Sequence, residues 1–250
     1  MPLAQDQIAH QFYLPFGDKI ALAVAVLPES WSNHAMQGQM NISEYCERLD
    51  PGTWAEPANF LSNAGFLLAA AWSYRQARRQ GLDQDASVIW LVLWLAAIGL
   101  GSGLFHSLAT PWSKICDVVP IAIFVASFYG LWLRQVLGFT RRLLAVAYLV
   151  LGMMTALSLA MFQAPIFAGS QGYFGVLILL PVLGAWQWRR CNSKPRLLYA
   201  SIAFTFALAC RTIDQPLCPW LPSGTHWLWH LLNAYVCLCA LQSMLEDKRV

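Results

Sequence analysis

Seven long apolar stretches dominate this chain and restrict its possible folds more than any other feature. A helix of about 20 mostly apolar residues crosses the hydrocarbon core of a bilayer, whereas irregular backbone and open sheet edges cannot face lipid. The sequence therefore predicts an all-α membrane protein, a bundle of seven transmembrane helices. The stretches cover approximately residues 57–74, 88–108, 117–137, 143–162, 172–188, 197–213 and 226–245.

The composition supports this class. Only 12% of the residues are charged and 58% are hydrophobic, whereas a soluble domain has about 25% charged residues. Together with a net charge of +3, these values argue against a soluble globule, a disordered chain and a protein that binds nucleic acid through a basic face. We expect an extracytoplasmic tail over residues 1–56, a seven-helix domain over 57–245 and a short cytoplasmic tail over 246–250.

The basic residues predict the orientation of the bundle, because Lys and Arg favour the cytoplasmic side of a membrane. They cluster in alternate connections and at the C-terminus, which predicts a cytoplasmic C-terminus and an N-terminus outside. The outer side is the periplasm in a bacterial inner membrane, or the lumen of an internal membrane in a eukaryote. The basic residues on the predicted inner side are Arg75, Arg78, Arg79, Arg134, Arg141, Arg142, Arg189, Arg190, Lys194, Arg196, Lys248 and Arg249.

Three histidines lie within the apolar stretches, where ionisable residues usually mark a functional site. His106 comes late in the second stretch, whereas His226 and His230 begin the seventh. Since these helices run in opposite directions, all three rings are expected at one depth near the outer surface. His226 and His230 share a helical face, and three protein ligands with one open position are typical of catalytic zinc. The alternative is that each ring is hydrogen-bonded to helix backbone.

Two further polar residues are expected beside the histidines. Ser102 precedes His106 by one helical turn, and Asp117 follows it across a Pro-containing turn. Aspartate can accept a proton or orient a ligand histidine, and serine can donate to a developing oxyanion. The alternatives are close helix packing for Ser102, among glycines at 99, 101 and 103, and an N-terminal helix cap for Asp117.

An acidic segment precedes the first apolar stretch. Its carboxylates, Glu44, Glu47, Asp50 and Glu56, fall within thirteen positions near Pro and Gly turns. Oxygen ligands of this kind suit calcium, although the spacing is not that of an EF-hand. A solvated acidic loop is the alternative, and Glu56-Pro57 is also a typical helix start.

The positions of the cysteines allow one disulfide bond. Those on the predicted outer side are Cys46, Cys116 and Cys218, and an oxidising outer compartment permits a single disulfide among them.

Taken together, these segments resemble the alkaline ceramidase family, which belongs to a wider group of seven-helix membrane hydrolases that includes adiponectin-type receptors. The resemblance extends over residues 44–233 and rests on several short motifs in the family's order. They are Tyr45-Cys-Glu-Arg, Trp54-Ala-Glu-Pro-Ala-Asn59 and Ser62-Asn63; then Ser102-x-x-x-His106 with Asp117; then Arg211-x-x-Asp214, Cys218 and His226-x-x-Trp-His230.

The resemblance implies two metal sites and a disulfide. Zinc would be held by the three histidines, with Ser102 and Asp117 beside it, and Cys46 would pair with Cys218. Calcium would be held by the side chains of Glu44, Glu47 and Glu56 and the carbonyl of Tyr45. Where the family often has an amide side chain, this chain has Leu49 followed by Asp50, so the fourth calcium ligand departs from the pattern.

The resemblance also implies a reaction. We expect hydrolysis of the amide bond of ceramide or a related N-acyl lipid, which would yield a fatty acid and a sphingoid-type amine. The expected partner is a membrane lipid and not a nucleic acid. A non-catalytic seven-helix lipid receptor with a structural zinc is the alternative. An ion transporter is disfavoured, because the ionisable residues gather on one side instead of crossing the membrane.

Overall fold

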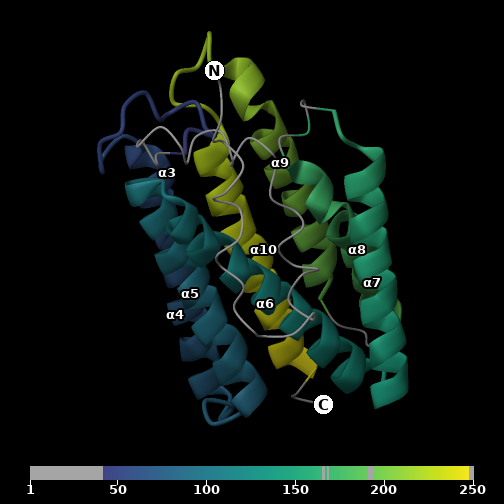
Figure 1. The fold of residues 1–250 in the computed structure, drawn as a ribbon. Coiled ribbons are helices and arrows are strands. Elements are labelled where there is room, and N and C mark those ends of the chain that lie inside the picture. Colours follow the sequence, from purple (N-terminus) through teal and green to yellow (C-terminus); the bar gives the residue numbers. More distant parts are fainter. Residues whose placement is uncertain (1–41, 165–166, 168, 191–193, 248–250) are drawn as a thin grey trace, which may run out of the picture. The chain divides into compact units, whose positions relative to one another are not determined.

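A computed structural model describes residues 42–164, 167, 169–190 and 194–247, and this part of the chain consists of helices and connecting turns without a strand (Figure 1). Every predicted apolar stretch coincides with a helix, so the all-α fold is confirmed. The tail before residue 42 and residues 248–250 lie outside the described residues. The helices are α3 Pro57–Ser62, α4 Ala64–Arg79, α5 Ala86–Leu108, α6 Pro111–Val136, α7 Arg141–Met161, the 3-10 helix η2 Ser170–Tyr173, α8 Phe174–Arg190, α9 Arg196–Leu217 and α10 His226–Asp247.

Five of these helices, α5, α6, α7, α9 and α10, are long and apolar enough to cross a membrane. The first and fifth predicted spans are interrupted. Asn63 separates α3 from α4, and the 3-10 turn η2 precedes α8. The continuous helices that remain there have 16 and 17 residues, somewhat short of the length that spans a bilayer. The chain is thus a multi-pass helical membrane protein.

Helix α6 begins earlier than predicted. Thr110 is its N-cap, and Thr110 and Ser113 form a capping box in which each side chain accepts a hydrogen bond from the other residue's backbone N–H. Pro111 occupies the first helical position, which suits its fixed φ and its missing N–H. Asp117 therefore lies in the second turn of α6, and the alternative that it caps this helix is wrong.

Helix α10 lies at the centre of the bundle. It contacts α3, α4, α5, α6 and α9, and in Figure 1 it runs between the pair α4 and α5 and the pair α7 and α8. In its most apolar window 67% of the residues are buried, compared with 11% in α7. α10 is therefore the helix around which the others pack, and α7 is peripheral.

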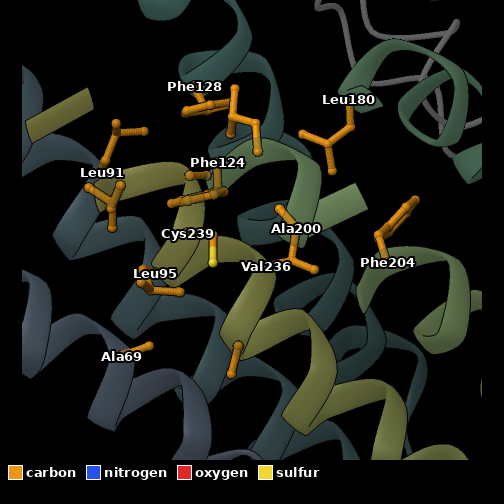
Figure 2. Close-up of a cluster of buried hydrophobic side chains, with 14 of the residues drawn as sticks. Ala69, Leu91, Leu95, Phe124, Phe128, Leu180, Ala200, Phe204, Val236 and Cys239 are labelled. Carbon is orange, nitrogen blue, oxygen red and sulfur yellow. The ribbon is translucent and has the colours of Figure 1, made fainter. Parts of the chain in front are cut away.

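The hydrophobic core joins α10 to its neighbours (Figure 2). Leu95 of α5, Phe124 of α6 and Ala200 of α9 pack with Val236 and Cys239 of α10 in one buried cluster. Because lipid tails are as apolar as these side chains, helices in a membrane associate mainly through close van der Waals packing of this kind. This core fixes the relative positions of α5 and α10, the two helices that carry the histidines.

Candidate metal centre

Three histidines meet at one end of the bundle. His106 comes from the last turn of α5, and His226 and His230 come from the first two turns of α10. Each offers a ring nitrogen, and these nitrogens all lie within 4.8 Å of one another. The three side chains are at most 2% exposed. In the described part of the chain, no other three His, Cys, Asp or Glu side chains come together in this way.

In two of the three histidines, the ring nitrogen that points away from the other histidines has a protein partner. His106 Nδ1 lies 2.6 Å from Glu56 Oε2, and His230 Nδ1 lies 2.8 Å from Ser62 Oγ. The Nε2 atoms of these two rings then face each other at 3.1 Å. Metal-binding histidines usually bind a carboxylate, carbonyl or hydroxyl group through the second nitrogen.

His226 provides an independent indication. Its Nδ1 is buried and has no hydrogen-bond partner, which is costly unless something else satisfies the nitrogen. The donor set of three imidazoles, two of them oriented by neighbours and one with an orphaned nitrogen, suits a transition-metal ion such as zinc. This buried group can hold a metal ion.

Tyr45 fixes the ring of His226. The two rings are stacked, with centroids 3.6 Å apart and planes inclined by 16°. Arg211 Nη1 donates a hydrogen bond of 2.9 Å to the Tyr45 hydroxyl oxygen. Burial raises the pKa of the Tyr45 phenol, although Arg211 opposes the shift, so the phenol stays protonated at neutral pH. The family resemblance implied a different role for Tyr45, that of a calcium ligand through its backbone carbonyl.

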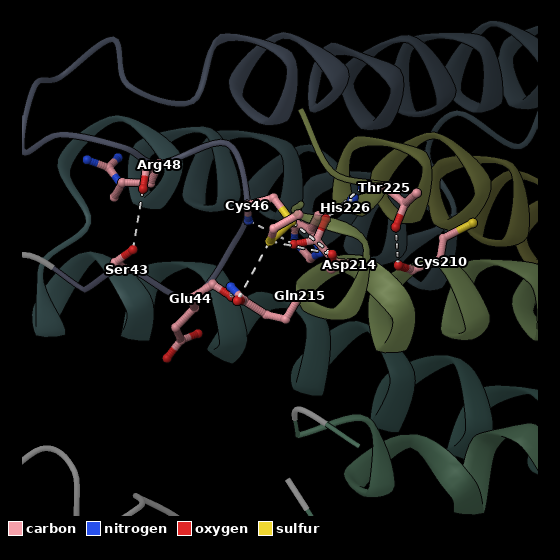
Figure 3. The surroundings of a disulfide bond; sticks show 10 residues. Ser43, Glu44, Cys46, Arg48, Cys210, Asp214, Gln215, Thr225 and His226 are labelled. Carbon is pink, nitrogen blue, oxygen red and sulfur yellow. Dashed lines mark hydrogen bonds between the residues drawn. A yellow bond between two sulfur atoms is a disulfide. The ribbon is translucent and has the colours of Figure 1, made fainter. Parts of the chain in front are cut away.

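Asp214 fixes the beginning of α10 (Figure 3). Its carboxylate accepts hydrogen bonds from three backbone N–H groups, those of Cys46 at 3.0 Å, Thr225 at 2.6 Å and His226 at 2.9 Å. The last two are otherwise unpaired donors at a helix N-terminus. One buried carboxylate therefore ties α9, α10 and the segment before α3 to each other beside His226.

A disulfide joins two of these elements, the segment before α3 and the end of α9. Cys46 and Cys218 are bonded, with their Cα atoms 5.2 Å apart and 172 positions apart in the sequence. Cys116 is a free cysteine. The pairing implied by the family resemblance is therefore present in the structure.

Removing this disulfide is expected to destabilise the protein by about 2–5 kcal/mol, because the crosslink restricts the unfolded chain. The measurement is the melting temperature of the purified protein with and without the phosphine reductant TCEP, compared with a Cys46→Ala/Cys218→Ala variant. Reduced wild type and the double variant should melt at the same lower temperature. A Cys237→Ala variant serves as control, and it should respond to the reductant as the wild type does. An unchanged melting temperature in fully reduced protein would contradict this expectation.

Ser102 lies one turn before His106 on α5, and Asp117 lies on the neighbouring helix α6. Ser102 is 2% exposed, and its side chain and His106 both interact electrostatically with the Asp117 carboxyl group. Gly101 allows this approach, because a Cβ atom there would collide with the carbonyl group of Cys116 on α6. Small-residue packing and a polar Ser–Asp pair therefore occur together at this contact.

Two carboxylates of the acidic segment have protein partners. Glu47 accepts hydrogen bonds from the N–H groups of Ala58 and Asn59 at 2.6 and 2.8 Å, and so caps α3. Glu56, which is 1% exposed, forms an ion pair with Arg48 and contacts His106. Burial tends to raise the pKa of the Glu56 carboxyl group, but its hydrogen bonds with His106, Asn59 and Arg48 hold that pKa below its usual range.

The fold and the buried histidines define a class: multi-pass helical membrane proteins with a candidate metal centre near one end. A comparison with protein-family models identifies the family, because the Ceramidase model matches residues 44–246. The chain therefore belongs to the ceramidase family. A comparison with curated proteins gives no match.

Proposed function

We propose that this chain is a zinc-dependent intramembrane hydrolase that cleaves the amide bond of ceramide or a related N-acyl lipid. Family membership implies a hydrolase that acts on amide bonds. The observation that carries the finer proposal is the buried group of three histidines with a Ser–Asp pair beside it. We assign zinc to His106, His226 and His230, and we assign direct roles in the reaction to Ser102 and Asp117.

Zinc held there would polarise the amide carbonyl and lower the pKa of a coordinated water towards ~7. Asp117 is the general base, which removes a proton from the water as its oxygen attacks the carbonyl carbon. Asp117 then gives this proton to the amide nitrogen as the carbon–nitrogen bond breaks. Ser102, which interacts with Asp117 in the free protein, donates to the carbonyl oxygen as negative charge develops there. The products are a carboxylic acid and an amine.

An apolar cavity supports a lipid substrate. It encloses about 690 Å³ of empty space, its open side included, and its walls come from α4 to α6 and from η2 to α10. Two wall residues also contact the histidines: the ring of Phe66 lies 6.5 Å from that of His230, and Trp229 stacks beside His226 at 6.5 Å. A hydrocarbon chain in this cavity would therefore place its polar head at the histidines.

The route of entry follows from a second, smaller cavity. Both cavities share Val125 and Phe128 of α6 with Val176 and Leu180 of α8, and the smaller one reaches Leu151 of α7. We propose that the lipid enters sideways here, between α6 and α8, because α7, which lines this side, is the least buried of the five candidate spans and can move aside most easily.

The orientation of the centre is also a proposal. Basic residues occupy the last turns of α4, α6 and α8 and the first residues of α7 and α9. All these positions are at the end of the bundle opposite to the histidines. Because basic residues favour the cytoplasm and disulfides persist in oxidising compartments, we propose that the centre faces the periplasm or a lumen.

The direct test is hydrolysis of a short-chain fluorescent ceramide by the purified, zinc-loaded protein, with both products identified by mass spectrometry. Release of fatty acid and amine in equal amounts is the expected result. Bound zinc without turnover on any N-acyl lipid would contradict the proposal and support a lipid receptor. Matched Ser102→Ala and Ser158→Ala variants compare two buried serines, of which only the first lies beside the histidines.

A variant of Ser62 tests how the partner of a ligand histidine affects zinc affinity. A Ser62→Ala variant loses the hydroxyl group at His230 Nδ1, and loss of such an outer partner typically lowers metal affinity by about 10–100-fold. The measurement is zinc affinity by competition with a chelating dye. Ser243→Ala, also on a buried serine but near the far end of α10, should leave the affinity unchanged. Equal affinities in the two variants would show that Ser62 does not support the ligand.

A further inference from the structure

Arg48 occupies the centre of the segment for which the family resemblance implied calcium. The side chain is buried, and its Nε pairs with Glu56. Its Nη1 lies 3.2 Å from the carbonyl oxygen of Gly52 and 3.5 Å from that of Asp50, and its Nη2 donates to the carbonyl oxygen of His106 at 2.8 Å. One guanidinium group thus contacts the carboxylate of Glu56, two carbonyl oxygens of the loop at residues 50–52 and one carbonyl oxygen near the end of α5.

The side chains predicted to bind calcium have other partners. Glu47 caps α3, Glu44 pairs with Lys114, and Asp50 Oδ1 accepts from the N–H of Gly52 at 2.6 Å. Leu49 offers no ligand atom and is 83% exposed. Calcium takes 6–8 oxygen ligands, yet no three of the carboxylates in the described residues converge as a ligand group. The residues of this segment therefore do not fit a calcium ion.

We propose that the Arg48 guanidinium is a permanent internal cation that stands in place of calcium in this chain and ties the acidic segment to the helices beside it. Arginine suits the task because its planar fork carries five donors and a charge that persists at every physiological pH. The guanidinium holds the loop at residues 50–52 against the end of α5. It also acts on His106 twice, through the backbone carbonyl and through Glu56.

Arg48 is consequently a positioning residue for the metal centre. Glu56 lies between Arg48 and His106, with one oxygen towards each. Without the guanidinium, this buried carboxylate would lose its charged partner and its fixed direction, and the His106 ring would lose orientation. This role rests on the proposed function only in that it concerns the same histidines.

The first experiment uses the wild-type protein and needs no variant. Terbium luminescence, excited through nearby aromatic side chains, reports binding at calcium sites. We expect no saturable luminescence that calcium displaces, and no change in melting temperature at about 10 mM calcium, a level about tenfold above the Kd of even weak protein sites. A calcium-dependent rise in melting temperature together with displaceable luminescence would overturn the proposal.

The second experiment compares Arg48→Gln with Lys114→Gln, which removes a partly exposed cation that pairs with Glu44. Breaking a buried ion pair is strongly destabilising, so Arg48→Gln should lower the melting temperature by about 10 °C. It should also weaken zinc binding by about 10–100-fold at temperatures where the protein is folded. Lys114→Gln should change neither quantity appreciably, and Arg48→Lys should restore part of the zinc affinity.

The zinc affinity of the variants distinguishes a positioning role of Arg48 from a role in protein stability alone. Arg48→Gln protein that binds zinc as tightly as Lys114→Gln protein would overturn the positioning role. Neither readout requires turnover. Absence of amide hydrolysis in the wild type would refute the proposed function and leave the calcium and zinc measurements decisive for Arg48.

Discussion

A His230→Ala variant is expected to bind no zinc and to hydrolyse N-acyl lipids no faster than the solution without enzyme. His230 Nε2 lies 3.1 Å from His106 Nε2 at the centre of the proposed site, and two imidazoles cannot supply the three protein ligands of a catalytic zinc. The measurements are zinc content by mass spectrometry and release of a fluorescent fatty acid from a short-chain ceramide.

The matched control for this variant is Ser243→Ala, on the same buried helix but away from the centre. It should retain both zinc and activity. Undiminished hydrolysis in folded His230→Ala protein would exclude zinc from the reaction. Loss of activity with full retention of zinc would instead show that His230 acts on the substrate and is not a ligand.

An Asp117→Asn variant is expected to keep its zinc and to lose activity by about 10²–10⁴-fold, the usual contribution of a general acid–base group. Asparagine has nearly the same shape as aspartate and can still interact with Ser102, so the contact between α5 and α6 should survive. What the variant lacks is a carboxylate that can take a proton from water and return it to the amine.

The comparison for Asp117 is Glu246→Gln, which removes a part-buried carboxylate paired with Arg196 near the opposite end of the bundle. This variant should retain hydrolysis at the wild-type rate. If Asp117→Asn stayed within a few-fold of that rate, another group would have to carry the proton. If the Asp117→Asn variant lost its zinc together with its activity, Asp117 would instead be needed to retain the metal.

The fold was largely predictable from hydropathy, since long apolar stretches in a membrane protein have few alternatives to helices. Helix ends were less predictable. The apolar pattern places the start of α6 near residue 117, but the capping box of Thr110 and Ser113 and the proline between them begin the helix at Pro111. Local hydrogen bonds, and not hydropathy, decide such boundaries.

The histidines were predictable because helices of alternating direction bring His106 to the depth of His226 and His230. Their partners were not. Tyr45 stacks on His226, and Asp214 bonds to Cys46, across more than 160 positions of sequence. Such contacts arise only when the chain has folded. Ser62 was found only within a family motif, and its partner His230 could not be inferred from spacing.

The acidic segment shows a different limit of prediction from the sequence. Carboxylates close together in sequence suggest a cation, and the inference of a positive partner agrees with the ion pair formed by Glu56. The sequence does not reveal which cation, because Arg48 stands among the acids as an ordinary charged residue. Only its burial and its four oxygen partners distinguish it.

The central position of α10 has a consequence for biosynthesis. Two of the three histidines are on this helix, and it follows all the other described helices in the chain. A ribosome must therefore complete every preceding helix before the centre can assemble. A nascent chain in the translocon therefore lacks the complete group of three histidines, and premature termination anywhere upstream of residue 226 yields a product without His226 and His230.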